Sequence, residues 1–157
     1  MRSFKSVGIS GQDALVQRTA VAPTPVRIGI VTPLSPGNND EGLLAMSYSV
    51  GAQMKNNLRD LLMTNWGERL GRYNYGANLQ PLVTEYENGK DAFDEAAMNR
   101  ISSTVQLYMP YVTLENFESN QTYSASTGVG NVVIFVDYSI SRAQVPTTRL
   151  QVVFAVS

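Results

Sequence analysis

The sequence predicts an α+β domain in which three helices precede a three-stranded antiparallel sheet, with an extended N-terminal arm ahead of them. Two changes of pattern carry this prediction. Apolar residues recur at helical spacing up to Tyr108, and after Pro110 they alternate with polar ones. Before residue 46, prolines, glycines and short polar clusters replace any regular period. We therefore expect an arm over residues 1–45 and a folded domain over residues 46–157.

Composition limits the functions open to this chain. Its 157 residues, of which 43% are hydrophobic and 16% charged, suffice for one ordinary core. The chain has no cysteine and no histidine, which excludes disulfides, zinc sites built on thiolate or imidazole, and every histidine-based catalytic triad. A formal net charge of -1 provides no broad attraction to nucleic acid or to an anionic membrane. We expect no cofactor.

The sequence also bears on where the protein works. No apolar run approaches the roughly 20 residues that a membrane-spanning helix needs. The first residues lack the apolar segment of a secretory signal. We therefore expect the protein to stay in the cytoplasm of the cell that makes it.

Within the arm, residues 1–18 have no sustained period, and residues 20–42 contain four prolines among turn-forming residues. The exception is a β-prone run over residues 26–31. Two interpretations remain open. The arm is a flexible tail, or it becomes ordered on a neighbouring protein, where residues 26–31 would add a strand to a sheet edge.

Three helices are predicted in the first part of the domain. The first, over residues 48–64, has an apolar stripe at helical spacing, formed by Val50, Met54, Leu58, Leu61 and Leu62, and Ser47 or Ser49 is expected to cap it. The second covers residues 79–85, with Asn78 as the expected cap. The third covers residues 91–108, and its buried face is predicted to contain Phe93, Ala97, Ile101, Thr104, Val105 and Tyr108.

Three strands follow Pro110. The first begins near Val112, and the second and third cover residues 131–140 and 147–156. The connections between them are too short for parallel crossovers, so the strands form an antiparallel meander. Val133 and Phe135 lie opposite the main apolar set of the second strand, which suggests that both faces of this strand are covered.

The loop between the first two helices is dense in glycine, tyrosine and charge, and it holds the only tryptophan, Trp66. Its sequence is LLMTNWGER at residues 61–69, followed by YGANL at residues 75–79. These strings resemble the signature of the small baseplate wedge proteins of contractile-tailed phages and of their type VI secretion counterparts. The family pattern is a Leu-Leu-x-Thr helix end, a Gly-Glu-Arg turn and an aromatic-Gly-small-x-Leu segment. A weaker similarity extends over residues 28–154.

This resemblance implies a structural protein of the virion that joins the baseplate to the first ring of the contractile sheath. It would be present in several copies around the tail axis, in a baseplate assembled in the host cytoplasm. Its partners would be the large wedge proteins and the tail sheath protein, with the tail tube or hub as further candidates, and neither nucleic acid nor a membrane is expected.

The resemblance also implies two sets of contact residues. Where the family has Glu-Pro-Arg between helix and strand, this chain has Met109-Pro110-Tyr111, so an apolar or aromatic version of that junction is expected. The predicted wedge interface consists of Leu62, Trp66, Gly67, Glu68, Arg69, Tyr75, Met109, Pro110 and Tyr111. Sheath subunits exchange strands, and the predicted sheath interface consists of Val132, Ile134, Val136, Tyr138, Leu150, Val152 and Phe154. The alternative is that these strands only close the core of the domain.

Two alternative functions are a glycosidase and a single-stranded nucleic-acid-binding module. Members of the family have been labelled lysozyme-like, and a glycosidase needs two carboxyl groups about 5–9.5 Å apart. Only Glu68 lies in a suggestive loop, and its neighbour Arg69 indicates a structural Glu–Arg pair, so we expect no enzymatic activity. Arg69, Arg72, Tyr73 and Tyr75 are also typical of single-stranded nucleic-acid binding, although two arginines better suit a protein interface.

Overall fold

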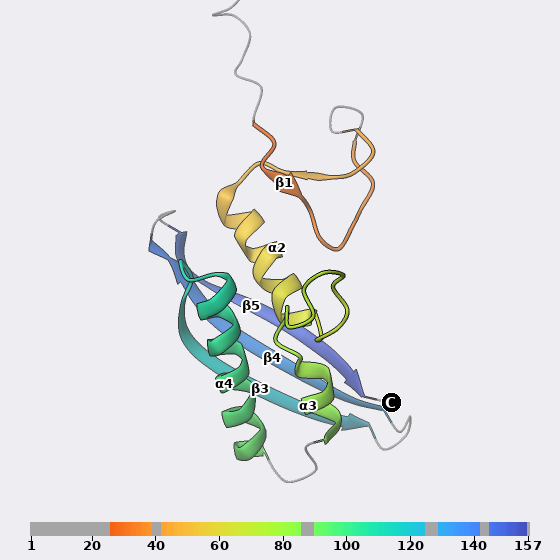
Figure 1. Ribbon diagram of the computed structural model, residues 1–157, viewed down its shortest axis with the longest axis vertical. Coiled ribbons are helices and arrows are strands. Elements are labelled where there is room, and N and C mark those ends of the chain that lie inside the picture. The colour runs from red at the N-terminus through yellow and green to blue at the C-terminus, as the bar shows by residue number, and fades with distance from the viewer. Residues whose placement is uncertain (1–25, 39–41, 86–89, 125–128, 142–144, 157) are drawn as a thin grey trace, which may run out of the picture.

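Helices cover one face of an antiparallel sheet. The computed structural model describes residues 26–38, 42–85, 90–124, 129–141 and 145–156. Strands β3 (Thr113–Ser124), β4 (Val129–Ile140) and β5 (Val145–Val156) pair in that order, with β4 in the centre. Helices α2 (Val50–Met63), α3 (Leu79–Glu85) and α4 (Lys90–Tyr108) lie on one side of this sheet (Figure 1). The predicted α+β fold is confirmed.

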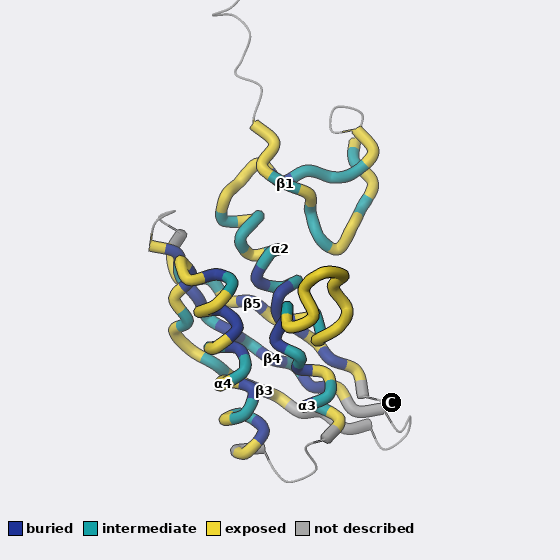
Figure 2. Tube along the Cα trace, viewed as in Figure 1, coloured by how far each residue is buried: buried dark blue, intermediate teal, exposed yellow. Residues whose placement is uncertain are grey.

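The core lies between the sheet and the helices, where the buried positions of both layers face each other (Figure 2). The helices contribute Leu58, Leu61 and Leu62 from α2, and Phe93, Ala97, Ile101 and Val105 from α4. Fully burying one such leucine or phenylalanine stabilises a fold by roughly 1.5–3 kcal/mol. This layer contact is therefore the main source of stability.

The helix ranges agree with the sequence prediction to within two residues, but the predicted side-chain capping bonds are not formed. Ser49 occupies the N-cap position of α2 without a side-chain cap bond, and the hydroxyl of Ser47 donates to the Ser49 carbonyl at 3.2 Å instead. At α3, the backbone N–H of Gln80 donates to Oδ1 of Asn65 at 3.4 Å. The side chain that caps α3 is thus that of Asn65 rather than that of Asn78.

A two-stranded hairpin precedes α2. Strand β1 (Gly29–Ile30) pairs antiparallel with β2 (Met46–Ser47), so the β-prone run over residues 26–31 finds a partner within its own chain. A Cβ on Gly29 would lie 2.5 Å from the side chain of Gln53, which shows how closely the hairpin packs against α2. Residues 1–25 of the predicted arm lie outside the described residues.

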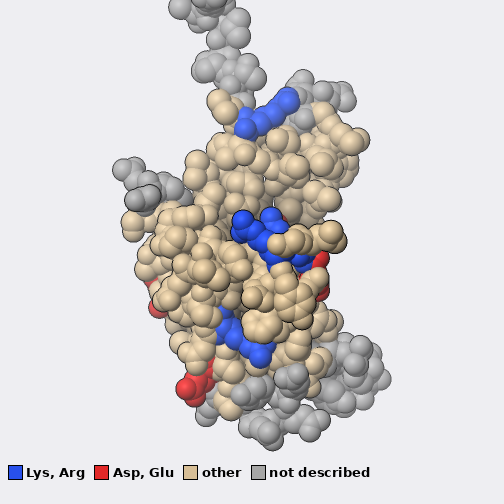
Figure 3. Space-filling view, viewed as in Figure 1, with Lys and Arg blue, Asp and Glu red and all other residues tan. Residues whose placement is uncertain are grey.

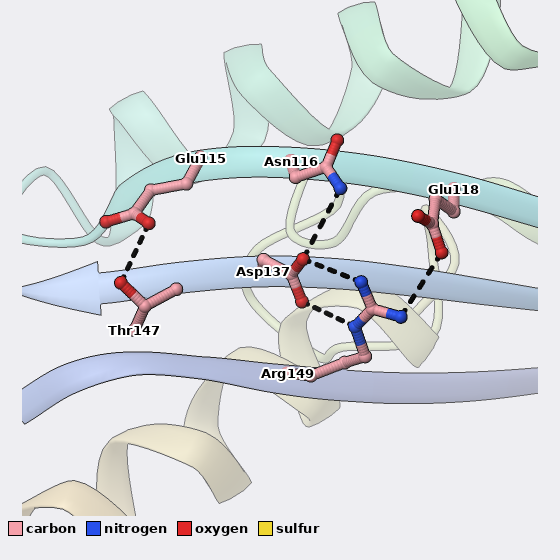
Figure 4. A network of polar contacts seen from close by, with 6 residues as sticks. All are labelled: Glu115, Asn116, Glu118, Asp137, Thr147 and Arg149. Carbon is pink, nitrogen blue, oxygen red and sulfur yellow. Dashed lines mark hydrogen bonds and ion pairs between the residues drawn. The ribbon is translucent and has the colours of Figure 1, made fainter.

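The outer face of the sheet differs from its prediction, because no helix or strand of the described residues covers it. A network of charged side chains crosses this face instead (Figure 4). Arg149 donates to Asp137 through Nε at 2.7 Å and Nη2 at 2.9 Å, and to Glu118 through Nη1 at 3.2 Å. The guanidinium also lies 5.6 Å from the ring centroid of Phe135. Polar cross-strand contacts therefore take the place of a second packed layer.

These contacts shift the ionisation of the groups involved. The hydrogen bond with Arg149 lowers the pKa of Asp137 and raises that of Arg149. Hydrogen bonds from Ser139 and Thr147 likewise lower the pKa of Glu115. Because these carboxyl groups bind protons less readily in the folded chain than in the unfolded one, they stabilise the fold above their unfolded pKa values.

We predict that Asp137→Asn flattens the acid-induced loss of stability. An unfolded aspartate titrates near pH 3.9, and the folded pKa of Asp137 lies lower. Its contribution is thus complete above that pH and is lost as the pH falls through the folded pKa. Urea unfolding of the parent and the variant between about pH 5 and pH 2 measures the difference in slope.

Glu95→Gln is the control, since Glu95 is an exposed carboxyl group that forms no ion pair or hydrogen bond within the described residues. Equal slopes for the parent and Asp137→Asn would show that the Asp137–Arg149 pair adds nothing to acid stability.

Candidate functional site

The loop over residues 64–78, between α2 and α3, is tightly bonded although much of it is exposed. The N–H of Gly67 donates to the Tyr73 carbonyl at 2.8 Å, which closes the loop across its base. Inside, Arg72 N–H donates to the Arg69 carbonyl and Tyr75 N–H to the Arg72 carbonyl, both at 3.1 Å. The loop is therefore built from successive turns with a defined shape.

Gly76 explains why the two strings of the sequence signature occur together. It is buried at a φ of 107°, and a Cβ there would lie 2.1 Å from the carbonyl oxygen of Thr64. The two following residues bond to the end of α2, Ala77 N–H to the Leu61 carbonyl at 3.1 Å and Asn78 N–H to the Thr64 carbonyl at 3.3 Å. The YGANL segment thus fastens onto the LLMT helix end.

The Gly-Glu-Arg turn is held by Asn65, and the predicted Glu68–Arg69 pairing is wrong. The Glu68 carboxylate accepts the backbone N–H and the Nδ2 of Asn65, both at 2.8 Å. These two bonds, the backbone one first, lower the pKa of Glu68. Within the described residues no salt bridge joins Glu68 to Arg69. The guanidinium of Arg69 lies instead over the Tyr75 ring, 4.2 Å from its centroid.

Aromatic contacts join the loop to the end of α4. Tyr75 and Tyr108 pack edge to face with centroids 4.9 Å apart, and the Tyr108 hydroxyl donates to the Asn74 carbonyl at 3.1 Å. The chain then continues through Met109 and Tyr111 towards β3. The Met-Pro-Tyr junction is thereby brought next to the Gly-Glu-Arg turn.

A groove of about 680 Å³, here called the loop groove, lies between these segments. It gathers five residues of the predicted wedge interface: Glu68, Arg69, Tyr75, Met109 and Tyr111. Of the others, Leu62 is buried in the core, and Pro110 is exposed beside the groove residues in sequence. Trp66 does not line the groove, and its Nε1 donates to the Gly76 carbonyl at 3.0 Å.

Other groove residues were not part of the predicted wedge interface: Asn57, Asp60, Thr64, Arg72 and Tyr108. Asn57 and Asp60 lie on one face of α2, and Thr64 follows as its C-cap residue, so their helical spacing is a signal that would have found them. The Thr64 hydroxyl donates to the Asp60 carbonyl at 2.6 Å, which holds the Thr64 side chain against the C-terminal end of α2.

The seven predicted sheath residues occupy a different environment. Val132, Ile134, Val136, Tyr138, Leu150, Val152 and Phe154 are all buried under the helices. Moreover, β4 pairs with β3 on one side and β5 on the other. Their side chains therefore belong to the core. Of the two strands that carry them, only β5 has an edge that pairs with no other strand of the described residues.

A second groove runs beside that edge, here called the β5 groove, with a volume of about 480 Å³. One wall comes from α2 through Lys55, Arg59 and Met63, and the other comes from the strands. The strand side is lined by Phe135, Arg149, Leu150, Gln151 and Val153. Basic and apolar side chains thus flank the free edge of β5.

The described residues show no feature of a metal site or of a membrane-spanning segment. No group of three or more His, Cys, Asp or Glu side chains is placed to hold a metal ion there. No helix in that part of the chain is both long and apolar enough to cross a membrane.

Two solved structures share this fold. A chain of the anti-feeding prophage baseplate, determined by cryo-electron microscopy, is 18% identical and matches 82% of this chain and 84% of that chain, with a TM-score of 0.52. A protein provisionally described as a tail lysozyme, from Geobacter sulfurreducens, is 19% identical and matches 69% of this chain and 90% of that chain, with a TM-score of 0.50. No family model and no curated protein matches the sequence. At these identities the likeness establishes the fold.

We predict that Gly76→Ala destabilises the protein far more than Gly71→Ala. Both glycines have a positive φ, but a Cβ on Gly71 meets nothing within 4 Å. Gly71→Ala should cost about 1–2 kcal/mol through its backbone alone. Gly76→Ala should cost roughly 3 kcal/mol or more, because a clash with the Thr64 carbonyl adds to the strain. Urea unfolding measures both values, and equal losses would contradict the proposed fastening of the loop to α2.

Proposed function

We propose that this protein is a structural wedge component of a contractile-tail baseplate and that it joins the baseplate to the first ring of the sheath. The observation that carries the proposal is the fold shared with a chain of the anti-feeding prophage baseplate over most of both chains. That baseplate was symmetrised six-fold, which agrees with several copies around a tail axis. The protein would act in the assembled tail, after assembly in the host cytoplasm, without a nucleic-acid or membrane partner.

The loop groove is the proposed contact with the large wedge proteins. It combines charged groups from Asp60, Glu68, Arg69 and Arg72 with aromatic surface. The carboxylate of Glu68 and the guanidinium of Arg69 are held by Asn65 and Tyr75 rather than by each other. Each can therefore receive a group of opposite charge from a partner without first breaking an internal ion pair.

The free edge of β5 is the proposed contact with the sheath protein. An added strand gains affinity from main-chain hydrogen bonds and specificity from side chains on its two sides. β5 is 12 residues long, and the β5 groove runs beside it. The central strand β4 takes no direct part, because its backbone is paired on both sides.

We further propose that the protein is not an enzyme, with a cell-wall glycoside hydrolase as the alternative. A general acid of that class needs a raised pKa, whereas hydrogen bonds from Asn65 lower that of Glu68. The description as a tail lysozyme applies to the Geobacter sulfurreducens protein and assigns no activity to this chain. Peptidoglycan cleavage by the purified chain that Glu68→Gln abolishes would contradict this proposal.

The first test concerns the wedge contact. Glu68→Ala and Arg69→Ala should each weaken binding to the purified large wedge proteins about tenfold or more, as expected for charges at the centre of an interface. The lost internal contacts are exposed, so the unfolding free energy should fall by only about 1 kcal/mol. Titration calorimetry and thermal melts give the two quantities.

Glu95→Ala is the matched control and should bind like the parent. It removes an exposed glutamate near the N-terminal end of α4, whereas the loop contacts the C-terminal end of this helix. If both loop variants melt far below the parent, the turn has a structural role and the wedge assignment fails.

The second test concerns the sheath. Val153 is half exposed on β5, and lysine on an edge strand opposes the addition of another strand. Val153→Lys should therefore give a folded protein that enters baseplates but no longer starts sheath growth, which electron microscopy of complemented particles would reveal. Asn131→Lys places the same charge on the outer face of the central strand and should leave sheath growth intact. Normal sheath growth on Val153→Lys baseplates would show that the sheath does not start at the edge of β5.

A further inference from the structure

Four large apolar side chains lie exposed on the loop and on the adjoining end of α4. Leu70 is 100% exposed, Tyr73 72%, Leu107 69% and Trp66 50%. We call these residues the anchor surface. Leu70 follows the Gly-Glu-Arg turn, and the Tyr73 ring lies against Gly67, since a Cβ on that glycine would be 3.2 Å from it. Exposed apolar side chains of this size on a well-bonded loop are typical of a protein-binding site rather than of a free surface.

A groove of about 390 Å³ separates Trp66 from Leu107. Asn74, Ser103, Thr104 and Tyr108 complete its lining. Tyr108 also lines the loop groove, and it is the residue that the two linings share. The tyrosine therefore separates two grooves, one lined with charged groups and one walled by an indole and a leucine.

Positive charge accompanies the anchor surface. Arg100 lies 5.9 Å from the Trp66 ring centroid, and one of its N–H groups donates to the Asn78 carbonyl at 2.6 Å. Within the described residues neither Arg100 nor Arg72 forms a salt bridge. In the view of Figure 3, basic side chains gather over the loop between α2 and α3 and again below it, and acidic ones lie towards the margins. Charge complementarity thus favours a partner that presents carboxylates to the anchor surface.

We propose that the anchor surface docks a protein surface of the baseplate on which an apolar side chain, seated between Trp66 and Leu107, is flanked by carboxylates facing Arg72 and Arg100. This inference rests on the proposed function and defines the chemistry of a second contact beside the loop groove. Trp66 supplies the rigid aromatic area that dominates many interfaces. The two leucines favour a protein over a single-stranded nucleic acid, because aliphatic side chains offer no stacking platform.

The test uses the full chain and the purified large wedge proteins of the same particle. Leu70→Ser and Leu107→Ser should each weaken binding roughly tenfold, since buried anchors carry most of the energy of an interface. Both side chains are exposed in the free protein, so the melting temperature should stay close to that of the parent. Leu43→Ser is the matched control, because Leu43 is 88% exposed but lies beyond the loop, in the segment before β2, and this variant should bind like the parent.

Charge gives an independent measurement. Arg100→Gln should reduce the salt dependence of the same binding, because Arg100 lies over Trp66 and does not line the loop groove, and an ion pair near the surface weakens as ionic strength rises. If the parent binds equally well at low and high salt, the proposal of an acidic partner is overturned.

The outcomes separate this inference from the proposed function. If the parent chain does not bind the wedge proteins, the proposed function fails. If the parent binds and Glu68→Ala weakens it, while both serine variants bind like the parent, the anchor surface is not an interface and the function stands. Binding of a thymidine oligonucleotide that Leu70→Ser leaves unchanged and Arg72→Gln abolishes would identify a nucleic-acid surface and overturn the inference. So would self-association in sedimentation that the serine variants abolish.

Discussion

The contact between the backbone of Gly76 and the carbonyl of Thr64 is the constraint on which the arrangement of this protein depends. Only a residue without a Cβ brings the two chain segments this close. Once they meet, Ala77 and Asn78 satisfy carbonyl groups at the end of α2, which would otherwise need water or a capping group. The same contact directs the chain into α3, and Arg100 then joins α4 to it through the Asn78 carbonyl. One close approach thus positions the loop and all three described helices.

A loop fastened in this way has a functional consequence. Its ends are tied to buried parts of the fold, Leu61 at one side and Leu79 at the other, while its middle is exposed. Side chains there are held by turns and by contacts with Asn65 and Tyr75, so less conformational entropy is lost when a partner binds. A rigid loop that presents charge on one side of Tyr108 and apolar surface on the other suits the proposed role in a baseplate, where a protein must fit its neighbours without rearranging.

The sequence could predict the layers of this fold because a single periodic signal determines each element. Leu58, Leu61 and Leu62 identify α2, and the alternation of β4 and β5 identifies their buried face. The same signal could not separate core from interface, so the buried residues of β4 and β5 were predicted as sheath contacts. Caps and pairings failed for another reason. Asn65 bonds to the start of a helix fifteen residues along the chain, which no local pattern predicts. It also holds the Glu68 carboxylate from three residues away, whereas the prediction considered only the adjacent Arg69.

The outer face of the sheet bears on the proposed contact with the sheath protein. Side chains on the inner face of β5 are buried against the helices, and Arg149 on the outer face is already bonded to Asp137 and Glu118. A partner that packed flat on this outer face would have to desolvate that network, which is costly unless every charge is satisfied again. A partner that approaches along the edge of β5 meets the exposed Val153 and main-chain groups that pair with no other strand of the described residues. Edge addition is therefore the attachment that disturbs the existing contacts least, and Lys55 and Arg59 beside it would favour a strand that carries acidic residues.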